Sequence, residues 1–107
     1  FEYGCMTGVI LGAAANHALT IIDGFNTTAS AFIAKALCPE VVHYLMASHL
    51  SLEQAHKKSL ADLGLTQYID LDFRLGEAIG AGIQTRMLDY ALSVYRECAA
   101  KDEEVKA

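Results

Sequence analysis

The sequence predicts an α/β fold: a fragment of a parallel, doubly wound sheet of about three strands, flanked by helices and followed by a long C-terminal helix. The first supporting observation is that segments with helical spacing of apolar residues alternate with short β-branched runs, which is typical of βαβ units. The second is that hydrophobic residues make up 53% of the 107 residues, enough for the core of one small domain.

The first helix is expected over about residues 1–16, where Gly4, Gly8 and Gly12 recur at every fourth position. This spacing leaves a smooth stripe on which another helix or strand can pack closely. The β-branched run at residues 18–22 follows and predicts a buried strand.

The second helix is expected to begin at a cap supplied by Thr27 or Thr28 and to stop at Leu37, before Pro39. Residues 41–47 then predict a second strand, in which His43 is expected to pack against its neighbours.

Ser51 and Gln54 fit a capping box at the start of the third helix. That helix is expected to end at Leu63, because Gly64 suits the left-handed turn that closes many helices. Residues 68–71 predict a weak third strand.

The last helix is expected over about residues 77–100. Apolar residues recur along it at helical spacing, which is typical of an amphipathic helix. This stripe consists of Ile79, Ile83, Met87, Tyr90, Ala91, Val94 and Cys98.

Charge and cysteine content narrow the functional classes. The net charge is −5 and the eight Lys and Arg residues are scattered, so the sequence lacks a basic nucleic-acid footprint. The apolar stretch at residues 5–15 is too short to span a bilayer.

An odd cysteine count without a CxxC pair argues against a disulfide framework and against a zinc site. We expect Cys5, Cys38 and Cys98 to be reduced core thiols of a cytoplasmic protein, and no metal or other cofactor is predicted.

Polar and small residues follow each predicted strand. Because ligands bind beyond the carboxyl ends of the strands in open α/β sheets, these residues are expected to share one binding edge. They are Asp23 after the first strand, Ser48, His49 and Ser51 after the second, and Arg74, Gly76 and Glu77 after the third.

Glu77 is the strongest candidate for catalysis. It stands where small residues let a ligand approach the backbone, and its carboxylate can accept a proton from a bound substrate. The alternative is a first-turn glutamate that complements the helix dipole. Ser51 at a helix start predicts a phosphate site, with an ordinary cap as the alternative.

The other candidates also allow two interpretations each. Asp23 can bind a ribose hydroxyl or form a plain Asp-Gly turn. His49 can bind phosphate, stack on a ring, or be a partly buried structural residue. Arg74 can neutralise a phosphate, hold Glu77 ionised, or form a surface salt bridge to a nearby aspartate.

Several short motifs occur in an order and spacing that resemble a known family. They are Ile22-Asp23-Gly24-Phe25, Leu37-Cys38-Pro39, Tyr44-Leu45-Met46-Ala47-Ser48-His49 and Leu71-Asp72-Phe73-Arg74-Leu75-Gly76-Glu77. The chain resembles the C-terminal third of the nicotinate-nucleotide:dimethylbenzimidazole phosphoribosyltransferases. Almost the whole chain takes part in the resemblance.

The resemblance implies an enzyme that moves phosphoribosyl from nicotinate mononucleotide to 5,6-dimethylbenzimidazole, giving α-ribazole phosphate and nicotinate in cobalamin lower-ligand synthesis. It implies a parallel α/β sheet with a small helical domain, a homodimer and no required metal. The catalytic glutamate of the family falls on Glu77 as general base, in a largely apolar slot. The phosphate-binding serine matches Ser51, and Asp23 matches an aspartate at the active-site edge.

The chain departs from the family pattern in two places. Leu50 stands where the family usually has arginine, and Ala78-Ile79 replaces the usual Gly-Thr after the glutamate. Ala78 and Ile79 add bulk beside Glu77, which predicts an altered acceptor slot and makes other bases or phenolic acceptors possible.

We expect residues 1–107 to be the C-terminal portion of such a domain, with an upstream part that completes the active site. The isolated fragment is then expected to be inactive, and to associate with that part or form a homodimer. The main alternative is a non-catalytic interaction module that dimerises through the glycine-striped first helix. A third is a generic nucleotide-binding α/β domain.

Overall fold

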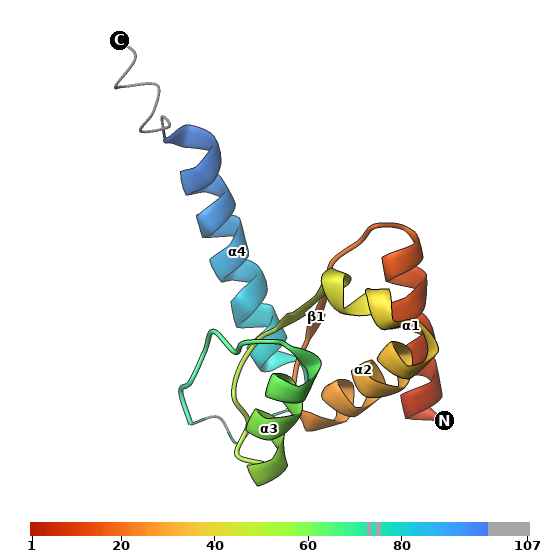
Figure 1. Ribbon diagram of the computed structural model, residues 1–107. Coiled ribbons are helices and arrows are strands. Elements are labelled where there is room, and N and C mark those ends of the chain that lie inside the picture. The colour runs from red at the N-terminus through yellow and green to blue at the C-terminus, as the bar shows by residue number, and fades with distance from the viewer. Residues whose placement is uncertain (73, 75, 99–107) are drawn as a thin grey trace.

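The computed structural model describes residues 1–72, 74 and 76–98 (Figure 1). Helices and short strands alternate along the described chain, which confirms the predicted α/β class. The elements are α1 (Glu2–Ala15), β1 (Thr20–Ile22), α2 (Phe25–Leu37), the 3₁₀ helix η1 (Pro39–Tyr44), β2 (Leu45–Ala47), α3 (Gln54–Leu63) and α4 (Ile79–Glu97).

The sheet consists of β1 and β2, which pair in parallel with Thr20 opposite Leu45 and Ile22 opposite Ala47. The α2 helix connects them as the crossover of a βαβ unit. The predicted third strand is wrong for the described residues, where His49 and Ile69 form one isolated parallel bridge. Within the described residues, this segment pairs with β2's continuation at Ile69 only, which is buried, whereas Tyr68 and Leu71 are exposed.

The second strand is shorter than predicted, because η1 occupies residues 39–44. Pro39 lies at the start of η1, and its fixed φ favours a helical turn there. Val41 still points into the core, but His43 is exposed rather than packed, 3.4 Å from the Glu40 carboxylate.

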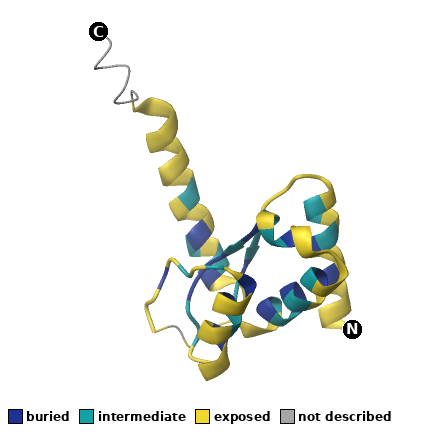
Figure 2. Ribbon diagram, viewed as in Figure 1, coloured by how far each residue is buried: buried dark blue, intermediate teal, exposed yellow. Residues whose placement is uncertain are grey.

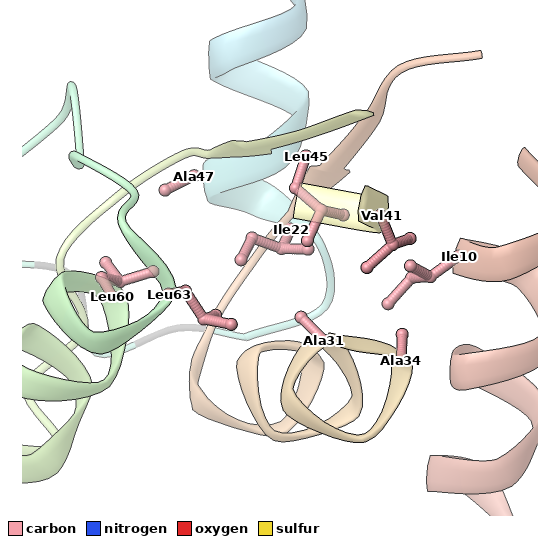
Figure 3. Packing of buried hydrophobic residues seen from close by; sticks show 9 residues of the cluster. All are labelled: Ile10, Ile22, Ala31, Ala34, Val41, Leu45, Ala47, Leu60 and Leu63. Atoms are coloured by element: carbon pink, nitrogen blue, oxygen red, sulfur yellow. The ribbon is translucent and has the colours of Figure 1, made fainter. Parts of the chain in front are cut away.

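The hydrophobic core lies between the sheet and helices α1, α2 and α3 (Figure 3). Small residues on α2 let it approach closely, and α1 packs beside it with the Thr7 hydroxyl donating to the Ser30 carbonyl at 3.2 Å. The core residues are Ile10, Ile22, Ala31, Ala34, Val41, Leu45, Ala47, Leu60 and Leu63.

The predicted glycine stripe of α1 packs on nothing within the described chain. A Cβ atom at Gly4, Gly8 or Gly12 would meet no other atom within 4 Å. The core side of α1 is instead formed by Thr7 and Ile10.

The α4 helix projects away from the rest of the molecule, and most of its length is exposed (Figures 1 and 2). Its buried residues are Gly80 and Gln84, whereas Met87, Tyr90 and Val94 are exposed. The predicted apolar stripe therefore lies on a helix, but most of it is exposed within the described residues. The predicted helix end at residue 100 lies outside the described residues.

Two further predictions concern single positions. Gly64 ends α3 in the left-handed conformation, with φ of 79°, which confirms the predicted helix end.

The three cysteines are free and exposed, so the prediction of core thiols is wrong. No described helix combines the length and the apolar composition that crossing a membrane would need.

Candidate active site

A pocket of about 610 Å³ opens beyond the carboxyl ends of β1 and β2. One wall is formed by residues 23–27, at the end of β1 and the start of α2. A second wall contains His49 and residues 51–53, and a third contains Arg74 and residues 76–78. The structure thus brings together every sequence-predicted site residue except Ser48, at the sheet edge where sequence reasoning placed them.

Ser48 lies beneath the pocket rather than on its wall. Its side chain is fully buried, and its hydroxyl lies 2.9 Å from the Ile22 carbonyl and 3.3 Å from the Asp23 carbonyl. Donation to these acceptors ties β2 to the end of β1. Ser48 therefore has no exposed surface for a ligand, which contradicts its expected direct contact with substrate.

Asp23 connects the end of β1 to the start of α4. One carboxylate oxygen, Oδ1, accepts a hydrogen bond from the Ala81 N–H at 2.9 Å, and the same atom lies 3.7 Å from His49 Nδ1. The sequence offered either a ribose contact or a local turn for Asp23. The structure adds a third role, the capping of a helix that begins far away in the sequence.

His49 is buried between the carboxyl ends of the two strands and the start of α4. Its residue is 1% exposed, and its Nδ1 lies 3.1 Å from the Ser48 hydroxyl. The imidazole rests directly on Gly80, where an added Cβ would lie 2.6 Å from both Cγ and Cε1 of the ring. The structural interpretation of His49 is therefore confirmed in part, although the residue also contributes to the pocket wall.

His56 is a residue that sequence reasoning missed. It is fully buried on α3, where His56, Leu60 and Leu63 follow helical spacing on one face. That spacing was the available signal for burial. His56 Nδ1 accepts from the Ser51 N–H at 3.0 Å, so the proton of the neutral ring is on Nε2, 3.0 Å from the Thr28 hydroxyl oxygen.

The surroundings of His56 favour its neutral form. Burial lowers the pKa of His56 first, and the neighbouring His49 lowers it further, whereas the Asp23 carboxylate opposes both effects. The ring centroids of the two histidines are 6.2 Å apart. A neutral imidazole matches the acceptor role that Nδ1 has toward the Ser51 backbone.

Ser51 does not cap α3. The helix begins at Gln54 after the N-cap Glu53, and no side chain caps it, so the predicted capping box is wrong. The Ser51 backbone N–H instead donates a hydrogen bond to His56 Nδ1. Its hydroxyl oxygen is buried and has no hydrogen-bond partner among the described residues, although Ser51 lines the pocket.

Glu77 lies in a tight turn ahead of α4. The Ile79 N–H donates to the Gly76 carbonyl at 3.3 Å across the turn. Glu77 and Ala78 both have left-handed backbone, with φ of 60° and 61°. Since α4 begins at Ile79, Glu77 is not a first-turn residue, and that alternative interpretation is wrong. Its side chain is exposed, so the described residues do not enclose it in the expected apolar slot.

Arg74 is exposed on the pocket wall. Within the described residues, no ion pair joins it to Asp70, Asp72 or Glu77, so neither the surface salt bridge nor direct pairing with Glu77 is found. The pocket therefore combines one guanidinium and a buried hydroxyl with carboxylates on its walls. Such a set can hold an anionic group and exchange a proton with a neighbouring one.

The described residues contain no cluster of three or more side chains suited to hold a metal ion. The apolar part of the pocket includes Phe25, whose ring meets His56 edge-on with centroids 6.5 Å apart. An aromatic face beside polar groups suits a flat ligand with one polar end.

A family model described as "Phosphoribosyltransferase" matches residues 1–105. The chain is 47% identical over 103 residues to the nicotinate-nucleotide–dimethylbenzimidazole phosphoribosyltransferase of Syntrophotalea carbinolica, covering 96% of this chain and 29% of that protein. It is 41% identical over 103 residues to the protein of the same name from Clostridioides difficile, covering 96% and 30%.

The structure is also similar to a solved one. The crystal structure of the enzyme of this name from Thermus thermophilus superposes with a TM-score of 0.86 at 33% identity, covering 92% of this chain and 30% of that one. The chain thus spans about three tenths of the length of the relatives that it matches.

Proposed function

The chain belongs to the phosphoribosyltransferase family, and we propose that it forms part of an enzyme that transfers phosphoribosyl from nicotinate mononucleotide to 5,6-dimethylbenzimidazole. The products are nicotinate and α-ribazole phosphate. The observation that carries this proposal is the position of Glu77, on the wall of a pocket at the carboxyl ends of parallel strands, together with Arg74 and Ser51. The relatives are named for this reaction.

In the proposed mechanism, Glu77 is the general base. Its carboxylate accepts the N–H proton of the benzimidazole while the other ring nitrogen attacks the anomeric carbon of the ribose. The bond between that carbon and the nicotinate nitrogen breaks, and its electron pair returns to the pyridine ring. A positioned base of this kind typically contributes about 10²–10⁴ in rate.

The phosphate of nicotinate mononucleotide is proposed to lie near Ser51 and Arg74. The Ser51 hydroxyl lacks a partner among the described residues, and Ser51 lines the pocket. Although its oxygen is buried in the empty site, rotation of this short side chain would let it donate to a phosphate oxygen. Arg74 is exposed on the same pocket and supplies a positive charge. Together they supply a charge-assisted anion site without a metal.

The remainder of a family-length polypeptide is proposed to complete the site. This chain spans about three tenths of its relatives, and Glu77 is exposed to solvent in it. A covering segment would exclude water and strengthen the interactions of the carboxylate. A second copy of the protein in a homodimer is another way in which Glu77 could be shielded from solvent. The Ala78-Ile79 departure lies next to Glu77, so acceptor preference is expected to differ from that of relatives with smaller residues there.

The proposal is tested by measuring nicotinate release from nicotinate mononucleotide, with and without 5,6-dimethylbenzimidazole, in the longest form of the protein that can be produced. Acceptor-dependent release supports the reaction. The Glu77→Gln variant keeps the shape of the side chain but cannot act as the base, and we expect turnover to fall about 10²–10⁴-fold. A well-folded protein without release across several benzimidazoles and phenols would contradict the proposal.

A non-catalytic interaction module is the second candidate. The exposed glycine stripe of α1 and the exposed apolar residues of α4 favour it, since neither surface packs on the described chain. Under this alternative, Glu77→Gln leaves cellular function unchanged. Substitutions in the glycine stripe of α1 would instead change the oligomeric state.

A further inference from the structure

The first turn of α4 is held by a carboxylate from a distant part of the chain. The N-cap of α4 is Ala78, whose side chain cannot accept a hydrogen bond, and no side chain caps the helix locally. Asp23 supplies this contact instead, because its Oδ1 accepts from the Ala81 N–H at 2.9 Å. Its negative charge also faces the positive end of a 19-residue helix.

The first turn of α4 also packs against a second side chain, at Gly80, one residue before Ala81. The buried imidazole of His49 rests on Gly80, and its Nδ1 lies 3.7 Å from Asp23 Oδ1. The Asp23 side chain is 13% exposed, so protein surrounds most of it. The carboxyl ends of β1 and β2 therefore hold two consecutive residues of α4 through Asp23 and His49.

Glu77 depends on this anchor because its own backbone is in a rarely populated conformation. Glu77 and Ala78 both have positive φ, which non-glycine residues adopt only where the surrounding structure enforces it. The turn is joined to α4 without an intervening linker, and Gly82 N–H donates back to the Ala78 carbonyl at 2.9 Å. Release of the first helical turn would therefore also release the turn that carries Glu77.

We propose that Asp23 is a positioning residue for the transfer reaction: by holding the Ala81 N–H, it fixes the turn that presents Glu77 to the pocket. The inference rests on the proposed function, since it requires Glu77 to exchange a proton with the acceptor. It differs from the interpretation of Asp23 as a ribose ligand. A ribose ligand would govern affinity for nicotinate mononucleotide, whereas a positioning residue governs the rate of the chemical step.

The kinetic test compares Asp23→Ala, Asp23→Asn and the wild type in the longest form of the protein. For Asp23→Ala we expect kcat to fall about 10–100-fold, as for a base displaced by about 1 Å. The dissociation constant for nicotinate mononucleotide, measured by calorimetry, should stay within about threefold. Asp23→Asn keeps an acceptor oxygen and should lose less. Asp89→Asn removes an exposed carboxylate of α4, paired with Arg86 at 3.8 Å, and should leave kcat unchanged.

A double-mutant cycle with Glu77→Gln tests whether Asp23 acts through Glu77. Under single-turnover conditions with excess enzyme, Asp23→Ala should cost less than about threefold when Glu77 is already replaced. An equal loss in both backgrounds overturns the inference. A tenfold weaker affinity for nicotinate mononucleotide with unchanged kcat also overturns it.

Amide hydrogen exchange separates this inference from the proposed function. In Asp23→Asn or Asp23→Ala, the Ala81 amide should exchange faster, while amides in the middle of α4 keep their protection. Unchanged protection of Ala81 in both variants overturns the anchoring role, whatever the activity. Absence of nicotinate release from the wild type would instead overturn the proposed function, and the exchange result would still report on the anchor.

Discussion

Gly80 lies directly beneath the imidazole ring of His49, and no larger residue fits between them. A Cβ atom at position 80 would lie 2.6 Å from Cγ and Cε1 of the ring and closer still to Nδ1. The His49 ring is buried and cannot swing into solvent. This contact sets how closely α4 approaches the carboxyl ends of the strands, and thereby where the pocket wall formed by residues 76–78 lies.

Gly80→Ala is therefore expected to destabilise the chain. Alanine normally stabilises a helix by about 0.5–1 kcal/mol relative to glycine, but overpacking a buried contact costs about 1–3 kcal/mol. We expect a net loss of about 1–2 kcal/mol in the free energy of unfolding, measured by urea denaturation of the 107-residue chain.

Gly82→Ala is the matched control for this substitution. Gly82 lies in the same helix, and an added Cβ there meets nothing within 4 Å. We expect a gain of about 0.5–1 kcal/mol from helix propensity alone. Equal effects of the two substitutions would contradict the assignment of Gly80 as a contact-limited position.

The left-handed backbone of Ala78 leads to a second prediction. At φ of 61° an alanine costs about 1–2 kcal/mol, whereas glycine avoids this cost but loses more entropy on folding. Ala78→Gly should therefore stabilise the chain by about 0.5–1 kcal/mol in urea denaturation. Ala91→Gly, in the exposed interior of α4, should destabilise it by about 1 kcal/mol. A loss of stability in Ala78→Gly would show that the turn is not strained in solution.

The elements with strong local signals are predictable from the sequence. The left-handed end of α3 depends on Gly64 itself, because glycine favours that backbone conformation. The βαβ unit follows from the spacing of hydrophobic residues along the chain. Shared placement of Asp23, His49 and Glu77 also followed, because parallel strands bring their carboxyl ends to one edge.

The remaining errors come from tertiary contacts that no local pattern encodes. Ser51 has the sequence of a helix cap, but its backbone N–H is taken by the buried ring of His56, and the helix begins later, at Gln54. Likewise, α4 is capped by Asp23 from 58 residues away. The apolar stripe of α4 has correct helical spacing, but periodicity does not indicate which partner covers it.

The lowered pKa of His56 predicts a pH dependence of stability. Burial, assisted by His49, lowers the pKa in the folded state below the ordinary value of about 6.5, so the unfolded chain binds this proton at higher pH. The stabilisation is complete above about pH 6.5 and is lost as the pH falls below that value. Between pH 7.5 and 5.5, the free energy of unfolding should fall by at most about 1.4 kcal/mol per pH unit from this residue.

His56→Gln provides the test of this assignment. The variant removes the titrating group while His17, His43 and His49 remain. Denaturant unfolding at several pH values should show a flatter profile for the variant between pH 7.5 and 5.5, together with lower stability at pH 7.5, because the bonds to Ser51 and Thr28 are altered. A profile as steep as that of the wild type would assign the dependence to another group.

Ser48 and Ser51 give opposite expectations for the same substitution. The Ser48 hydroxyl is buried and lies 2.9 Å from the Ile22 carbonyl, to which it donates, so Ser48→Ala should cost about 1 kcal/mol of stability. The Ser51 hydroxyl oxygen is buried without a partner among the described residues, so Ser51→Ala should be neutral or slightly stabilising in the isolated chain.

For ligand binding, Ser51→Ala should have the larger effect of the two substitutions. An unpaired buried hydroxyl lowers the stability of the empty protein, which suggests that it has a partner when the ligand is bound. In the longest form of the protein, we expect Ser51→Ala to weaken nicotinate mononucleotide binding about 10-fold, the loss of one hydrogen bond to a charged group. Ser48→Ala, whose hydroxyl faces β1 rather than the pocket, should bind within about threefold of the wild type. Calorimetric titration of both variants measures this. Equal affinities would show that Ser51 does not contact the phosphate.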